Sequence, residues 1–199
     1  QLQGGTMAQQ LKIIGVSGSL RQQSFNTRLL KEALCDLVSQ DVETDLIDLS
    51  AVQLPFYNAD DEASSGMPTE VRIAREKVIA ADCLYIATPE YNGASPGVLK
   101  NFLDWMSRKE TVDDVPLKAF SHKTAVMMSA TVGASGGVRA MTGLNTQLAY
   151  LGVMVIPQRF SLINAGSCFT DSDGLAKEHI DRLKDFNRSV VAQIKRNND

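Results

Sequence analysis

Residues 11–27 read LKIIGVSGSLRQQSFNT, and this stretch decides the fold class. Its apolar first part, 11–16, is typical of a buried strand, and the strand ends at the turn Ser17-Gly18-Ser19. After the turn, apolar residues fall on one face of a helix, at Leu29, Leu30, Ala33, Leu34, Leu37 and Val38. A buried strand that leads directly into an amphipathic helix predicts the first βα unit of an α/β domain.

The same alternation continues along the chain. Further strands are predicted at residues 42–49, 83–88, 124–130 and 153–156, and further helices at 69–81, 95–106, 138–151 and from Leu175 to Ile194. The run 42–49 alternates apolar and polar residues, which is typical of an edge strand with one face in water. We therefore predict an α/β, flavodoxin-like three-layer sandwich, in which a five-stranded parallel sheet in the order 2-1-3-4-5 has helices on both faces.

Two local expectations concern the connections. Residues 51–67 and 113–121 are rich in turn residues and are expected to be loops. Ser95 is expected to cap the helix that follows it, with Pro96 as the first helical residue, because serine and proline favour these two positions.

Composition and charge exclude several function classes. The chain has 199 residues, 44% of them apolar, and a net charge of -3, so it lacks the basic composition of a nucleic-acid binder. No apolar run is long enough to span a bilayer and the first residues do not resemble a signal peptide, so we expect a cytoplasmic protein without a membrane partner. The 3 cysteines and 2 histidines lack the spacing of a metal site. We expect residues 1–10 to be a tag remnant and disordered N-terminus, and 11–199 to form a single domain.

The first loop, residues 17–27, has the composition of a phosphate site. A helix N-terminus favours an anion because it offers unpaired backbone N–H groups and the positive end of the helix dipole. Arg21 adds a planar cation suited to phosphate. The loop has neither the Walker A pattern nor the G-x-G-x-x-G pattern of dinucleotide sites, so a monophosphate such as that of FMN fits better. The alternative is a serine-rich turn that only caps the helix.

The second loop and the helix after it, residues 89–105, read PEYNGASPGVLKNFLDW. Proline at both ends of the loop, with glycine between, can hold backbone donors and acceptors in fixed positions. A planar flavin ring needs such groups along one edge and an apolar surface on a face, which Tyr91 can supply. The glycine-rich loop 129–137 is expected to meet the first two loops at the carboxyl ends of strands one and three.

These loops resemble those of the NADPH-dependent FMN reductase family, flavodoxin-like proteins that include quinone, chromate and azo-dye reductases. The resemblance rests on Gly18-Ser19-Leu-Arg21 with Ser24 and Asn26, on Pro89-Glu90-Tyr91-Asn92, on Pro96-Gly97-Val-Leu99-Lys100-Asn101 with Asp104-Trp105, and on Gly136-Gly137-Val-Arg139. It implies that the FMN phosphate is surrounded by Ser17, Ser19, Arg21, Ser24, Asn26 and Thr27. It also implies that the isoalloxazine ring is bordered by Pro89, Glu90, Tyr91, Asn92 and Gly93, and on another edge by the loop with Ser129 and Gly133.

The resemblance implies an FMN-dependent NAD(P)H oxidoreductase, with FMN bound and NAD(P)H as co-substrate. Hydride would pass through FMN to small acceptors such as quinones, chromate, azo compounds or free flavin. Because the flavin carries such chemistry, we expect no catalytic side chain, and we interpret Glu90 as a solvent-facing loop residue and not a general acid. The alternatives are a flavodoxin-like single-electron carrier and a non-catalytic flavodoxin-like module.

A wide apolar arc on the helix 95–106 predicts self-association. Its apolar residues cover roughly 160° at about 100° per residue, more than the stripe of about 100° that a helix packed on a sheet needs. These residues are Val98, Leu99, Phe102, Leu103, Trp105 and Met106. We expect a homodimer or homotetramer, which the family resemblance also implies. The alternative is that the loop 113–120 covers the extra apolar surface.

Overall fold

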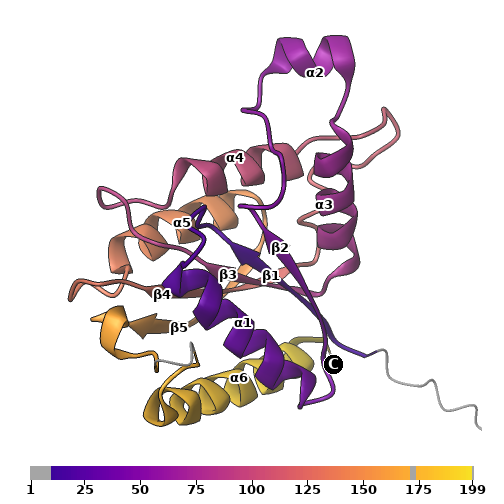
Figure 1. Cartoon of the computed structure of the whole chain (residues 1–199). Coiled ribbons are helices and arrows are strands. Elements are labelled where there is room, and N and C mark those ends of the chain that lie inside the picture. Colours follow the sequence, from indigo (N-terminus) through magenta and orange to yellow (C-terminus); the bar gives the residue numbers. More distant parts are fainter. Residues whose placement is uncertain (1–9, 171–173, 199) are drawn as a thin grey trace, which may run out of the picture.

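Five parallel strands form the centre of the structure, a computed structural model that describes residues 10–170 and 174–198. The strands are β1 (Lys12–Ser17), β2 (Glu43–Asp48), β3 (Cys83–Ala87), β4 (Thr124–Ala130) and β5 (Met154–Leu162). They pair in the order β2-β1-β3-β4-β5, which confirms the predicted topology (Figure 1). Of residues 1–10, which were expected to be a tag remnant and disordered N-terminus, residues 1–9 lie outside the described residues.

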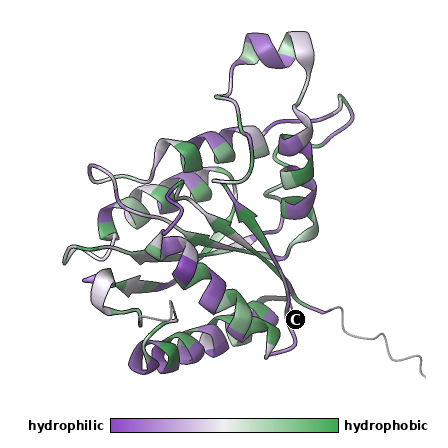
Figure 2. Ribbon diagram, in the orientation of Figure 1, coloured by the Kyte–Doolittle hydropathy of each residue, from purple (hydrophilic) through white to green (hydrophobic). Residues whose placement is uncertain are grey.

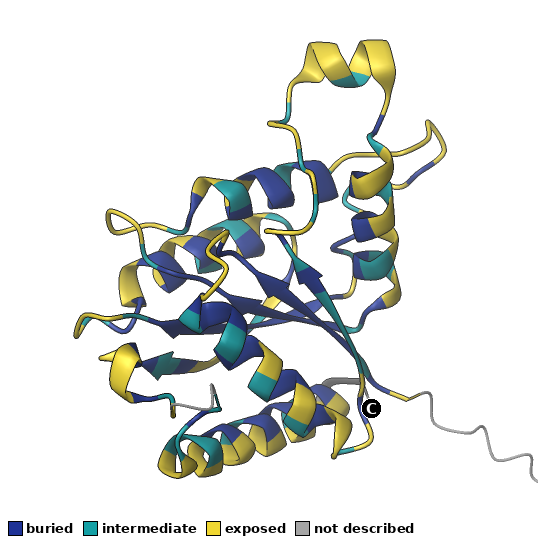
Figure 3. Cartoon of the chain, viewed as in Figure 1, coloured by how far each residue is buried: buried dark blue, intermediate teal, exposed yellow. Residues whose placement is uncertain are grey.

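Alternate residues of the inner strands face two separate apolar cores. In β3, Cys83, Tyr85 and Ala87 pack in one core, whereas Leu84 and Ile86 pack in the other. Figure 2 shows hydrophobic residues concentrated on the central strands, and Figure 3 shows the same strands buried. Because both faces of the inner strands are buried, their sequences are continuous apolar runs, and this made them predictable.

Helices cover both faces of the sheet, as the sequence predicts (Figure 1). On one face, α1 (Phe25–Val38) packs beside α6 (Lys177–Asn198). The other face is covered by α3 (Thr69–Ala80), α4 (Gly97–Met106) and α5 (Val138–Tyr150), and a short 3-10 helix, Ala165–Ser167, follows β5. Within the described ranges, no helix combines the length and the apolar character needed to cross a lipid bilayer.

The edge strand β5 is longer than predicted, because it continues past residue 156 to Leu162. Its pairing with β4 shifts between Val155, which lies opposite Ala125, and Arg159, which lies opposite Met127. Pro157 falls within this bulge. Proline has no N–H for the hydrogen-bond ladder, so bulges and edge strands are the places that accept it. The sequence does not show that pairing resumes after such an interruption.

Two local predictions are wrong: residues 51–67 are not entirely loop, and Ser95 does not cap α4. Residues 51–67 contain the short helix α2 (Ala59–Ser65), whose N-cap Asn58 accepts a hydrogen bond from the Asp60 N–H at 3.0 Å. No residue of α2 is buried and the helix stands away from the body (Figures 1 and 3), so apolar periodicity could not reveal it. At α4, Pro96 and not Ser95 is the N-cap, with no side-chain capping bond.

The apolar arc of α4 is buried within the chain, so the inference from this arc to a subunit interface is wrong. Trp105 is only 2% exposed, and its Nε1 donates to the Pro55 carbonyl at 2.7 Å. The Tyr57 ring packs edge-on against Trp105, with ring centroids 5.1 Å apart. Phe120 joins the same core from the loop between α4 and β4. Loops on both sides therefore cover the surface that the arc presents.

Candidate functional site

A cavity of about 220 Å³ lies where the chain leaves the carboxyl ends of β1, β3 and β4. The strand order reverses between β1 and β3, so this is the switch point at which doubly wound folds bind ligands. The three loops singled out in the sequence supply its walls. The lining residues are Ser19, Arg21, Ser24, Phe25, Asn26, Pro89, Glu90, Tyr91, Ala130, Thr131, Val132, Gly133 and Ser135.

The first wall is the start of α1. Ser24 is its N-cap, and the Ser24 Oγ accepts a hydrogen bond from the Thr27 N–H at 3.3 Å. The first turn contains no acidic residue, so nothing there opposes an anion at the positive helix end. Arg21 is exposed and adds a cation to the cavity. The capping alternative is thus true of Ser24, but Arg21 and Ser19 also line the cavity.

Two hydroxyls support this wall from beneath. Ser17 Oγ and Thr27 Oγ1 lie 2.6 Å apart and form a buried hydrogen bond. Neither residue lines the cavity. The turn above them is fixed by the Gly18 N–H, which donates to the Ala87 carbonyl of β3 at 2.9 Å.

Asn26 joins the first wall to the third. Its Nδ2 donates to the Ala130 carbonyl at 2.9 Å, and its Oδ1 accepts from the Ala130 N–H at 2.9 Å. These two hydrogen bonds to the end of β4 link residues that are 104 positions apart in the sequence. Asn26 therefore holds the cavity walls together and also lines the cavity.

The second wall is the loop after β3. Asn92 and Gly93, with φ of 52° and 77°, form the tip of a tight turn in which Tyr91 and Ala94 exchange backbone hydrogen bonds of 2.9 and 3.1 Å. Asn-Gly is the dipeptide that favours positive φ at both central positions of such a turn. Tyr91 lines the cavity and is 47% exposed, whereas Asn92 and Gly93 do not line it.

Glu90 differs from expectation, because its side chain is 6% exposed and does not face solvent. Its carboxylate accepts hydrogen bonds from the backbone N–H groups of Arg139 at 3.0 Å and Ala140 at 3.2 Å. The Arg139 guanidinium adds a bond of 2.6 Å. Burial alone would raise the pKa of Glu90, but the hydrogen bonds from Ala140 and Arg139 outweigh it and hold the pKa below its ordinary value. Glu90 is thus held as a carboxylate, which does not suit a proton donor.

The third wall follows β4. Ser129 is fully buried, and its Oγ donates to the Thr88 carbonyl at 2.7 Å, so it lies beneath this wall and does not line the cavity. Two backbone hydrogen bonds fix Thr131. Its N–H donates to the Leu162 carbonyl at 2.9 Å, and its carbonyl accepts from the Ala165 N–H at 2.9 Å.

The sequence identified most of the lining but not all of it. Of the thirteen residues named from the sequence, the structure brings Ser19, Arg21, Ser24, Asn26, Pro89, Glu90, Tyr91 and Gly133 into the cavity. Ser17, Thr27, Asn92, Gly93 and Ser129 lie behind or beside it. Phe25, Ala130, Thr131, Val132 and Ser135 also line it and were missed. They belong to stretches that the sequence analysis singled out. Phe25, Ala130 and Val132 are apolar, and the hydroxyls of Thr131 and Ser135 belong to none of the motifs on which the family resemblance rests.

The chain is similar to several known proteins. The sequence model of a family described as NADPH-dependent FMN reductase matches residues 11–167. An NAD(P)H-dependent FMN reductase of Pseudomonas aeruginosa is 38% identical over 168 residues, which cover 84% of this chain and 85% of that protein. A quinone reductase of Escherichia coli K12 is 33% identical over 150 residues, 75% of this chain and 76% of that protein. Among solved structures, FerB, a flavoenzyme NAD(P)H:acceptor oxidoreductase of Paracoccus denitrificans, shares the fold with a TM-score of 0.77 at 23% identity, covering 94% of this chain and 98% of that one.

Proposed function

Because this chain belongs to the NADPH-dependent FMN reductase family, we propose that it is an enzyme that binds FMN and uses NAD(P)H to reduce small acceptors. Quinones are the first class to test, since several relatives are named quinone reductases, and chromate, azo compounds and free flavin are the others. The observation that carries the proposal is the cavity at the switch point, where Arg21 and the N-terminus of α1 meet the loop that carries Tyr91.

The residues present fit FMN. A phosphate monoester needs cations and N–H or O–H donors, which Arg21, the first turn of α1 and the hydroxyl of Ser19 provide. Ser24 accepts a bond from Thr27, but its hydroxyl hydrogen is still able to donate. The N-terminus of α5 is not a second phosphate site, because the Glu90 carboxylate already occupies it. The phosphate therefore belongs at α1.

The size of the cavity suggests how substrates reach the cofactor. Pockets that enclose drug-sized ligands measure about 300–1,000 Å³, so a cavity of about 220 Å³ encloses only part of FMN. We place the phosphate inside, with the ring beside Tyr91 at the mouth. When bound, FMN accepts a hydride from a nicotinamide and passes electrons to an acceptor. The lining residues would position FMN, and we infer that NAD(P)H and the acceptor would both reach it through the same opening of the cavity.

Loss of the Arg21 cation should weaken FMN binding by about tenfold or more, because a hydrogen bond to a charged group contributes about 1.5–3 kcal/mol. The measurement is a fluorescence titration of Arg21→Ala with FMN. Lys31→Ala, which removes an exposed cation farther along α1, is the matched control and should bind FMN like the wild type. Riboflavin lacks the phosphate and should bind weakly to all three proteins. Equal affinity of the wild type for FMN and riboflavin would contradict this phosphate site.

A single open face should make NAD(P)H and the acceptor bind in turn. Steady-state kinetics with NADPH and a small quinone should then give parallel double-reciprocal lines, the pattern of a ping-pong mechanism. Intersecting lines would indicate a ternary complex and would contradict the shared opening. Rapid bleaching of the flavin by NAD(P)H alone separates this enzyme from a single-electron carrier.

We also propose that the chain forms a homodimer or homotetramer that supports FMN binding. The support is not the arc of α4 but the loop between β2 and α2, residues 49–58. Phe56 is 84% exposed, although Pro55 and Tyr57 on either side are held against Trp105. Aromatic residues are enriched in protein–protein interfaces, and a ring that a fixed loop presents to solvent fits such a contact. Light scattering at micromolar concentration should show an oligomer that Phe56→Ser shifts towards monomer. A wild-type monomer with undiminished FMN affinity would refute the proposal.

A further inference from the structure

One buried carboxylate joins the second wall of the cavity to the helix that follows the third wall. Glu90 lies in the loop after β3. Among the residues that the structure describes, its hydrogen-bond partners all lie in the first turn of α5, directly after the loop that forms the third wall. Backbone N–H groups of Arg139 and Ala140 and the Arg139 guanidinium all converge on it. Charge-assisted bonds of this kind are the strong ones, and the positive end of a helix adds to them.

Arg139 also reaches the tip of the Tyr91–Ala94 turn. A Cβ added at Gly93 would lie 3.7 Å from Arg139 Nε and 3.8 Å from Arg139 Cδ, so the arginine side chain runs alongside this glycine. The Arg139 side chain is 63% exposed, whereas the Glu90 side chain is 6% exposed. The guanidinium therefore contacts the carboxylate from the solvent side, and the same arginine side chain runs beside the turn.

We propose that Glu90 and Arg139 are positioning residues: together they hold the loop 89–95 against the start of α5, and this sets the affinity for FMN. This rests on the proposed function, because the loop matters only if a flavin lies beside it. Glu90 lines the cavity in which we place an anionic cofactor, and a free carboxylate there would repel it. The bonds from α5 and Arg139 compensate that charge, so the loop can border the flavin without repelling it.

The first test is a double-mutant cycle on FMN affinity. Glu90→Gln and Arg139→Ala should each raise the FMN dissociation constant by about tenfold, from the loss of charge-assisted bonds. In the double variant, the FMN dissociation constant should rise by clearly less than the product of the two single fold-changes, because both substitutions break the same set of contacts. Arg139→Lys keeps the charge without the planar fork and should fall between Arg139→Ala and the wild type. Glu76→Gln, at an exposed position of α3, is the control for loss of a carboxylate.

A kinetic measurement separates positioning from acid catalysis. At saturating FMN, the turnover of Glu90→Gln should fall by less than about tenfold, whereas loss of a general acid costs about 10²–10⁴. A fall in turnover of about 10²–10⁴ with FMN affinity unchanged would overturn the proposal. So would a double variant whose FMN dissociation constant rises by the full product of the two single fold-changes.

A third measurement needs no cofactor. In the FMN-free protein, the Arg139 and Ala140 amides, which donate to Glu90, should exchange hydrogen about tenfold faster in Glu90→Gln than in the wild type. If exchange is faster in the variant but the wild type binds no FMN, the proposed function is refuted and the positioning of the loop by Glu90 and Arg139 stands. Unchanged exchange in Glu90→Gln would refute that positioning role, whatever the wild type binds.

Discussion

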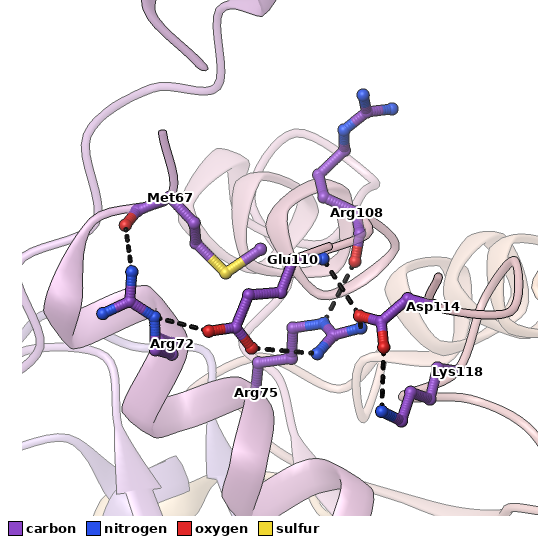
Figure 4. Close-up of polar contacts among 7 residues, drawn as sticks. All are labelled: Met67, Arg72, Arg75, Arg108, Glu110, Asp114 and Lys118. Carbon is purple, nitrogen blue, oxygen red and sulfur yellow. Dashed lines mark hydrogen bonds and ion pairs between the residues drawn. The ribbon is translucent and has the colours of Figure 1, made fainter. Parts of the chain in front are cut away.

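Arg75→Ala should lower the free energy of unfolding by about 3–5 kcal/mol, the cost of breaking a buried ion pair by removing one partner. Arg75 is 1% exposed, and its guanidinium donates to the Asp114 carboxylate at 2.8 Å and to the Arg108 carbonyl at 3.0 Å. Asp114 also accepts from Lys118 at 2.8 Å and from the Glu110 N–H at 3.0 Å (Figure 4). Arg75 thereby ties the loop after α4 to α3. Without Arg75, the buried Asp114 carboxylate would lose one of the two cations that pair with it.

The measurement is urea unfolding of the wild type and the variant at pH 7. Arg72→Ala is the matched control: it lies on the same helix and pairs with Glu110 at 2.6 Å, but its side chain is 41% exposed. An exposed pair contributes about 0–1 kcal/mol, so the control should lie close to the wild type. Similar losses in the two variants would show that burial of Arg75 does not matter.

The same cluster predicts how stability depends on pH. The hydrogen bond from Lys118, the Glu110 amide and the charge of Arg75 together hold the pKa of Asp114 well below its ordinary value, against the effect of burial. A lowered pKa in the folded state means that the stabilisation is complete above the unfolded pKa of about 3.9. It is lost as the pH falls from there through the folded pKa. The wild type should therefore lose stability below about pH 4, and Arg75→Ala should lose less over that range.

Gly137→Ala should disrupt both folding and the site. Gly137 has φ of +73°, and an added Cβ would lie 2.0 Å from Ser129 Oγ and 2.5 Å from Ser129 Cβ. The left-handed backbone costs a side chain about 1–2 kcal/mol, and displacing the Ser129 hydroxyl from Thr88 leaves buried polar groups unpaired at about 1–3 kcal/mol. We expect a loss of about 3 kcal/mol of stability. We also expect FMN affinity to fall by more than about tenfold, because the third wall must move.

Gly152→Ala is the control for Gly137→Ala. Gly152 also has positive φ, +80°, but nothing lies within 4 Å of an added Cβ. It should therefore show the backbone cost of about 1 kcal/mol alone and leave FMN binding intact. Calorimetry and FMN titration on both variants separate the two effects. If Gly137→Ala behaves like Gly152→Ala in both measurements, contact with Ser129 does not constrain the site.

Several features of this protein followed from the sequence because their causes are local. The inner strands β1, β3 and β4 are buried on both faces, so their apolar runs identify them without knowledge of their neighbours. The strand–turn–helix at residues 11–27 likewise carries its own signal, since the cap Ser24 and the helix it starts are adjacent in the chain. Once five such units are counted, the sheet order and the position of the cavity follow from topology.

Only the tertiary structure decided which partner each side chain meets. Trp105 is equally apolar in a core and in an interface, and it was the Pro55 carbonyl and the Tyr57 ring, some fifty residues away, that placed it inside. Glu90 in its loop gives no sign of Arg139, its partner 49 residues later. Hydrophobic periodicity and turn residues are properties of neighbouring positions. Burial of a charge and closure of a cavity depend on distant segments that only folding brings together, and for this reason local patterns could predict the fold but not the contacts that hold the site.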